Sequence, residues 1–251
     1  MLFSTTLFLF IFLPLVLMGY YNPIFTGRRF KNIFLLLASL VFYAWGEPVF
    51  VVLMMLSIVA GYVIGLLIDG NKAKEVKKRW LILGCSFHLG LLFVFKYLTF
   101  CSQQLGLLLH QDFSWIQIAL PIGISFFTFQ LLSYLFDIYY GKAQAQKNIL
   151  NLGLYIALFP QLIAGPIVRY DDIAAQIMHR QESMDDVVAG MQRFIYGLGK
   201  KVLIANYMAQ VADNIFASPG GGEMSVATAW LGAIAYTLQI YFDFSGYSDM
   251  A

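Results

Sequence analysis

Long runs of apolar residues recur along the whole 251-residue chain and leave few folds open to it. A membrane-spanning helix needs about 20 apolar residues to cross about 30 Å of hydrocarbon. Apolar residues make up 60% of the chain and charged residues only 12%, far below the roughly 25% that is usual in soluble domains. The sequence therefore predicts an all-α, polytopic bundle of membrane helices. Its full-length candidate spans are residues 2–21, 49–68, 80–100, 116–136, 150–168 and 227–247.

Two further segments are less regular. The run at 32–46 is shorter than a full span, and the run at 187–211 is interrupted by Arg193, Lys200 and Lys201. Charged residues at membrane depth face a polar interior rather than lipid, so the second run is amphipathic, re-entrant or part of a cavity wall. The chain is thus predicted to form one transmembrane domain, residues 1–251, with roughly seven or eight membrane segments.

The charges between these segments predict a topology. Basic residues cluster at 28–31, at 72–79 and at 142–147, in alternate gaps. Basic loops remain on the cytoplasmic side of a membrane. This rule places the N-terminus outside the cytoplasm. The acidic stretch 169–186 is expected to be external, and beyond it the rule no longer gives a consistent path.

Residues that perturb helices are densest in one segment, which holds Pro160, Gly165 and Pro166. Each proline removes a backbone donor from the helical ladder. In lipid, the freed groups must be satisfied by protein or by cavity water, so the segment 158–170 is expected inside the bundle. An ordinary proline kink in a lipid-facing helix is the competing interpretation.

The three histidines are the natural candidates for a general base. His88 is the weak candidate among them, because it lies within a predicted span, but a hydrogen-bonded core histidine is the simpler interpretation. His110 is expected at the membrane interface and His179 on a solvated polar face. Cys85 and Cys101 have no neighbouring Cys or His at metal-ligand spacing, so no metal site is predicted.

Two carboxylates, Asp243 and Asp249, close the last span. Six residues of α-helix separate them by about 120°, so they cannot act as a pair on one face. They either hydrogen-bond within the bundle beside Ser245 and Tyr247, or line a polar substrate path. The residues alone leave both interpretations open.

Three stretches resemble signature segments of the membrane-bound O-acyltransferase family, in its alginate O-acetyltransferase branch. They are PIGISFFTFQLLSYLFDIYYGK at 121–142, LFPQLIAGPIVRY at 158–170 and YTLQIYFDFSGYSDMA at 236–251, and FYAWGEPVF at 42–50 fits as well. The resemblance covers the chain from end to end. It implies that the chain corresponds to the N-terminal half of the family's fold. It implies a ring of helices around a tunnel, with an acyl donor, acetyl-coenzyme A, approaching from the cytoplasm.

The resemblance also implies roles for particular residues. Gln161, Pro166 and Arg169 in the second stretch, and Asp243, Ser245 and Asp249 in the third, are expected to support the tunnel. Arg169 would pair with a carboxylate or with phosphates of the donor, or else form a simple salt bridge. The family's histidine lies C-terminal to the third stretch and is expected beyond Ala251. No catalytic residue is therefore assigned, and this chain alone is expected to be inactive.

The function that the resemblance implies is acetyl transfer across the bacterial inner membrane, for O-acetylation of an exported polysaccharide such as alginate. Membrane lipid and extracytoplasmic acetyltransferases are the implied partners, and nucleic acid is not among them. One alternative lies within the family, namely D-alanyl transfer to teichoic acid-type acceptors. Another is a transporter or flippase without acyl chemistry, because such proteins also use proline-broken helices with buried polar residues. A third is a non-catalytic membrane scaffold that docks extracytoplasmic partners.

Overall fold

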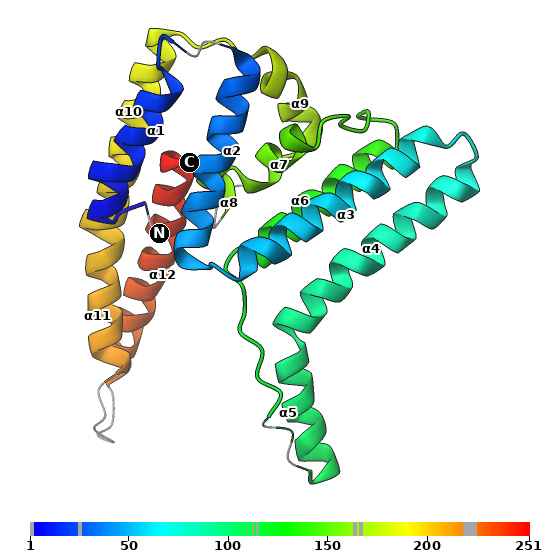
Figure 1. Cartoon of the computed structure of the whole chain (residues 1–251). Helices are drawn as coiled ribbons and strands as arrows, with labels where there is room; N and C mark the ends of the chain where they lie inside the picture. The colour runs from blue at the N-terminus through cyan, green and yellow to red at the C-terminus, as the bar shows by residue number, and fades with distance from the viewer. Residues whose placement is uncertain are drawn as a thin grey trace. The chain divides into compact units, whose positions relative to one another are not determined.

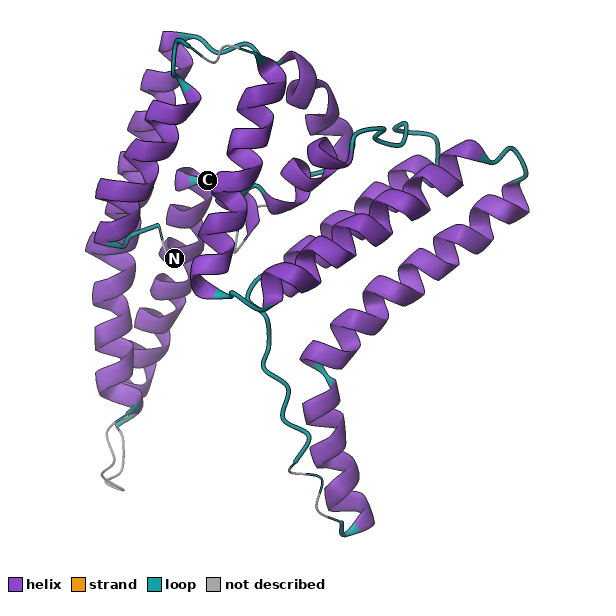
Figure 2. Ribbon diagram, in the orientation of Figure 1, coloured by secondary structure: helices purple, strands orange, loops and turns teal. Residues whose placement is uncertain are grey.

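The computed structural model describes residues 3–24, 27–111, 113, 115–162, 165, 168–217 and 225–251. Those residues form helices joined by loops and contain no strand (Figure 2). They divide into two compact units. The larger unit takes its residues from Val16–Ile163 and Ile167–Arg180, and the smaller from Leu2–Leu15 and Gln181–Ala251. The helical fold class is confirmed, and a single membrane domain stays a prediction.

In the larger unit the predicted spans 49–68 and 80–100 fall mainly on two long helices, whereas the helix predicted at 116–136 begins only at Ile124 (Figure 1). Two of its helices, α3 and α4, are long and apolar enough to cross a membrane. The total of seven or eight membrane segments stays a prediction. Its helices are α2 (Arg28–Gly46), α3 (Phe50–Gly70), α4 (Lys74–Lys96), α5 (Leu98–Leu109), α6 (Ile124–Tyr139), α7 (Ile149–Ala157), α8 (Phe159–Leu162) and α9 (Tyr170–His179), and α1 (Leu13–Tyr20) ends in it.

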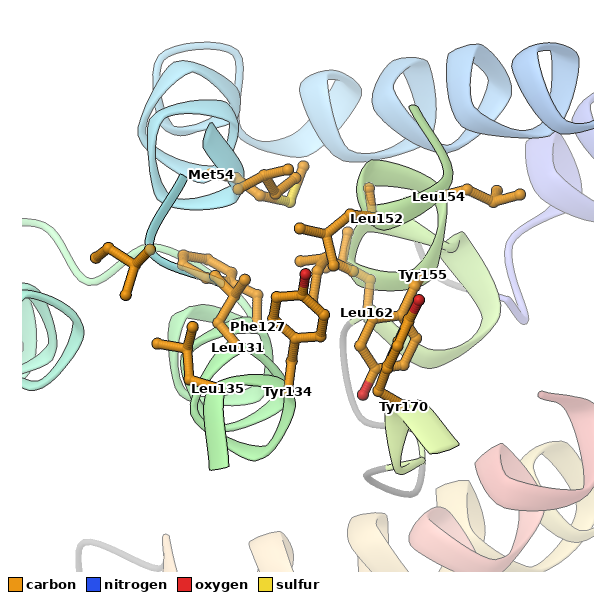
Figure 3. Packing of buried hydrophobic residues seen from close by; sticks show 14 of the residues in the cluster. Met54, Phe127, Leu131, Tyr134, Leu135, Leu152, Leu154, Tyr155, Leu162 and Tyr170 are labelled. Atoms are coloured by element: carbon orange, nitrogen blue, oxygen red, sulfur yellow. The ribbon is translucent and has the colours of Figure 1, made fainter. Parts of the chain in front are cut away.

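Close packing of α3, α4 and α6 forms the core of this unit (Figure 1). Glycines make the approach possible, because a Cβ at Gly61 would lie 2.6 Å from a methyl of Leu131, and one at Gly65 would lie 2.8 Å from the ring of Tyr134. Small residues at helix crossings are the usual way in which membrane helices come close. Figure 3 shows Leu131 and Tyr134 among the buried side chains of this core.

The predicted span at 150–168 is wrong as a single crossing helix. The structure breaks it into α7, which has nine residues, and the single turn of α8. Nine residues rise only about 13 Å, which is less than half of the roughly 30 Å of hydrocarbon. The segment also returns to its starting point, because the Gln146 amide donates a hydrogen bond of 3.1 Å to the hydroxyl of Tyr170. The described residues between 146 and 170 therefore leave and return at one level, and we call this segment the re-entrant hairpin.

The interior position predicted for 158–170 is confirmed at its buried residues and is wrong at Arg169, which is exposed. Phe159, Gln161 and Leu162 are all buried in the larger unit. The Tyr155 hydroxyl donates to the carbonyl of Val168 at 2.7 Å. This bond links α7 to the residues that lead back to α9. Broken backbone at membrane depth is tolerated where protein surrounds it. Pro166 lies outside the described residues.

A second correction concerns the side of the membrane on which α9 lies. The Arg28 guanidinium donates to the carbonyl of Arg180, and the Asn32 amide donates to the carbonyl of Ile177 at 3.0 Å. The Arg180 guanidinium in turn donates to Asn32 at 2.7 Å and to the hydroxyl of Tyr20 at 2.6 Å. The end of α9 and the start of α2 therefore lie at one level. The prediction that put residues 28–31 and 169–180 on opposite sides is wrong, since the hairpin does not cross.

The smaller unit is built around one uninterrupted helical run. This run comprises α10 (Met184–Gly199), the π-helix η2 (Lys200–Ala205) and α11 (Asn206–Phe216), and it packs against α12 (Val226–Met250). The side chain of Ser183 caps α10 by accepting from the amide of Asp186 at 3.1 Å, and Ser225 caps α12 in the same way through Thr228. The π-helix η1 (Phe8–Phe12) belongs to the same unit.

Candidate functional site

Charged side chains meet in the middle of the smaller unit, where η2 packs against α12. The Lys200 ammonium donates to the Asp249 carboxylate at 2.5 Å and to the Ser245 hydroxyl at 3.0 Å. Its neighbour Lys201 forms an ion pair with Asp243. The two acids therefore do not converge on each other, as their spacing predicted, and each has its own lysine. We call these five residues the η2–α12 charge cluster.

Two glycines place the cluster's lysines. A Cβ on Gly197 would lie 2.6 Å from the carbonyl oxygen of Gly246, and a Cβ on Gly246 would lie 2.7 Å from the carbonyl oxygen of Gly197. The two backbones are thus in direct contact. Asp243 and Asp249 stand three residues before and after Gly246. Consecutive lysines opposite this glycine can therefore reach the acids on either side of it.

A cavity of about 700 Å³ adjoins the charge cluster within the smaller unit. Arg193 adds a second cation there, at 3.6 Å from the Asp249 carboxylate. The volume is in the range of small-molecule sites, and the wall combines both signs of charge with an aromatic ring. Such a wall can bind a polar or anionic group beside otherwise apolar helices. The lining residues are Ala189, Gly190, Gln192, Arg193, Tyr196, Lys200 and Asp249.

The two described site residues of the second signature stretch differ in burial: Gln161 is buried and Arg169 is exposed. The Gln161 side chain is buried, and its amide donates to the carbonyl of Tyr155, which braces the hairpin. Arg169 precedes α9 as its N-cap residue and is exposed. Its charge acts on the carboxylate of Asp137 in α6 without an ion pair between the two side chains in the described structure. The structure thus brings the third stretch to the charge cluster, and Gln161 and Arg169 of the second stretch belong to the larger unit.

Comparison with known proteins agrees with the signature stretches. Residues 43–251 match the membrane-bound O-acyltransferase family. The chain belongs to this family. Over its whole length it is 44% identical to a Pseudomonas aeruginosa protein named Probable alginate O-acetylase AlgI, and 43% identical to one of the same name from Azotobacter vinelandii. It is 34% identical to a Helicobacter pylori protein named Peptidoglycan O-acetyltransferase.

The chain spans about half the length of these membrane-bound O-acyltransferases, 48% to 53% of each. Residues 181–251, which carry the charge cluster, include no histidine. The weak candidate His88 lies in α4, 1% exposed, and neither ring nitrogen has a hydrogen-bond partner among the described residues. His110 ends α5 in the left-handed conformation, and His179 is exposed at the end of α9. The described geometry therefore assigns no general base.

No group of three or more His, Cys, Asp or Glu side chains within the described ranges is placed to hold a metal ion. Cys85 and Cys101 are both free thiols.

Sequence reasoning did not pair the lysines with the acids. It used Lys200 and Lys201 only as interruptions of an apolar run, although their signs complement those of Asp243 and Asp249. Charged residues inside membrane proteins usually pair with one another, so this complementarity was the available signal. The glycines at the crossing gave a second signal, because close helix packing in membranes favours them.

Proposed function

We propose that the full-length protein transfers acetyl groups across the bacterial inner membrane, for O-acetylation of an exported polysaccharide such as alginate. The observation that carries the proposal is the 44% identity, over the whole of this chain, to a relative named as an alginate O-acetylase. The family match supports acyl transfer over the hypotheses of a transporter or a scaffold. Extracytoplasmic acetyltransferases would then be the partners on the far side.

Acetyl-coenzyme A is the donor that we propose. In the transfer, the bond between the acetyl carbon and sulfur breaks, an ester bond forms to an acceptor hydroxyl, and the hydroxyl proton passes to a base. The base then returns this proton to the sulfur, and coenzyme A leaves as the free thiol. We assign the base to the part of the full-length protein outside this chain, because the resemblance implies that the family's histidine lies C-terminal to the stretch 236–251.

The charge cluster supplies the polar wall of the path in this proposal. Lys200 and Lys201 are neutralised by Asp249 and Asp243, so the wall offers hydrogen-bonding groups without a large net charge. Arg193 remains 76% exposed and is the cation best placed to meet an incoming anionic or carbonyl group. Gln161 acts on the hairpin instead, by bracing its turn through the carbonyl of Tyr155, and Arg169 is an exposed residue at its exit.

A peptidoglycan acceptor is the second candidate. It is favoured by the 34% identity to the relative named Peptidoglycan O-acetyltransferase. Both candidates place the acetyl group on a sugar hydroxyl outside the cytoplasm, and D-alanyl transfer has no comparable support among the named relatives. Identifying the acceptor therefore requires measuring which polymer carries the acetyl ester.

The test is complementation in a strain that lacks its own polysaccharide O-acetylase. The complete reading frame, the 251-residue chain alone and the complete frame with Arg169→Ala would be compared, with acetyl ester content measured separately on exopolysaccharide and on peptidoglycan. We expect the complete frame to restore ester on exopolysaccharide, the short chain to restore none, and Arg169→Ala to reduce it. A complete frame that is inserted and stable but restores ester on neither polymer would refute the proposed function.

A further inference from the structure

The loop that enters the re-entrant hairpin is held in place by side chains from three helices. The amide of Ala145 donates to the Asp69 carboxylate of α3 at 3.3 Å, and the amide of Gln146 donates to the Tyr134 hydroxyl of α6 at 3.1 Å. The carbonyl of Lys147 accepts from the Tyr62 hydroxyl at 2.9 Å. With the bond from Gln146 to Tyr170 of α9, these contacts make the loop a preorganised element rather than a loose connection.

A groove of about 480 Å³ lies between this loop and the start of α9, wholly within the larger unit. Two cations, Lys142 and Lys147, line it together with the amides of Gln144 and Gln146. Neither ammonium group forms an ion pair within the part of the chain that the structure describes. The groove therefore offers hydrogen-bond donors and two positive charges without an ion-pair partner, against the single carboxylate of Asp171.

The apolar part of the lining distinguishes between ligands. It consists of four alanines, and the one ring in the wall, that of Tyr170, is buried. No leucine, isoleucine, valine or phenylalanine lines the groove, so it has no surface to accept an acyl chain. Small side chains leave room for a compact polar group instead. One carboxylate, Asp171, is also present and opposes an anion.

We infer that this groove binds the phosphate groups of a soluble ligand with two or more phosphate charges. Ammonium and amide donors on a fixed loop are the groups that recognise phosphate oxygens. A lipid headgroup shares the phosphate chemistry, but the absence of long apolar side chains from the lining favours a soluble ligand. The inference does not depend on the proposed acetyl transfer.

The experiment uses the 251-residue chain in nanodiscs of zwitterionic phosphatidylcholine, with pyrophosphate as the titrated probe and calorimetry as the readout. We expect saturable binding that Lys142→Gln with Lys147→Gln weakens about tenfold or more, because each removes one charge beside the anion. Asp171→Asn should strengthen binding about twofold to fivefold by the same reasoning. Both effects should shrink at high salt.

The matched control is Lys74→Gln with Lys78→Gln, which removes the same charge from exposed residues at the start of α4 that do not line the groove. Unchanged binding by this control supports the groove. Equal weakening by both double variants, or no saturable binding by a folded wild-type chain, would overturn the inference. Nanodiscs of phosphatidylglycerol that block pyrophosphate through Lys142 and Lys147 would overturn the soluble ligand in favour of a lipid headgroup.

Discussion

Gln146 and Tyr170 are 24 residues apart in the chain, yet the amide of one donates to the hydroxyl of the other at 3.1 Å. The bond joins the two ends of the re-entrant hairpin, so both ends lie at one level of the larger unit. The hydrogen bonds from Arg28 and Asn32 to the end of α9 extend this conclusion to the start of α2.

Cysteine labelling tests this topology directly. In a chain whose Cys85 and Cys101 are replaced by serine, single cysteines at Arg29 and Gln176 should react with an impermeant maleimide from the same side of the membrane. A cysteine at Glu47, one span away, should react only from the other side. Intact spheroplasts and inverted vesicles would be compared. Labelling of positions 176 and 47 from one side would contradict the re-entrant hairpin.

Tyr170→Phe should destabilise the larger unit by about 1 kcal/mol, because it leaves the Gln146 amide without its acceptor. Burial raises the pKa of the Tyr170 hydroxyl, and the hydrogen bond with Gln146 acts in the opposite direction. The pKa of Tyr170 is raised overall, so its hydroxyl stays neutral. The loss of stability in Tyr170→Phe should therefore not depend on pH near neutrality. Thermal unfolding of the purified chain measures it, with the exposed Tyr140→Phe as control. An equal loss in both variants would argue against the bond.

The glycine contact between α10 and α12 predicts a steric effect. Gly197→Ala should cost about 1–3 kcal/mol, since its methyl would meet the carbonyl of Gly246 and force the helices apart. Gly199→Ala in the same helical run has open space and should be neutral or stabilising by up to about 1 kcal/mol. The melting temperature and the membrane level of both variants are the readouts. Loss of stability in Gly199→Ala alone would refute the contact.

The charge cluster predicts that its two lysines are not equivalent. Lys200→Met leaves Asp249 with Arg193 at 3.6 Å, whereas Lys201→Met leaves Asp243 without a cation in the described structure. We therefore expect Lys201→Met to cost about 1 kcal/mol more than Lys200→Met. Asp243→Asn should restore part of the loss in the Lys201→Met background, which a double-mutant cycle would measure. Equal costs without rescue would show that the acids have other partners.

Hydropathy alone predicted the uninterrupted helix α3, but it did not predict that the run at 150–168 is broken into α7 and α8. Residues 49–68 read as a helix because nothing interrupts their apolar run, and α3 matches them within two residues at each end. The run at 150–168 has a similar composition, but burial by protein and burial by lipid select the same side chains. Only the contacts of Gln146, Tyr155 and Tyr170 reveal the hairpin.

The candidate site was predictable in part. The signature stretch 236–251 pointed to Asp243, Ser245 and Asp249, and the structure brings all three to lysines of η2. The partners could not be predicted, because ion pairing between helices depends on packing that has no local pattern.

The π-helix η2 changes the geometry of everything that follows it. Its hydrogen bonds span five residues instead of four, so it accommodates one residue more than an α-helical turn of the same rise. A helical wheel drawn from Met184 onward therefore assigns the residues of α11 to directions that are wrong by about 100°. In a relative that lacks one residue here, the same face of the helix would be carried by side chains one position earlier. Any alignment of the family across residues 200–205 has to place its gap inside this turn to keep equivalent faces together.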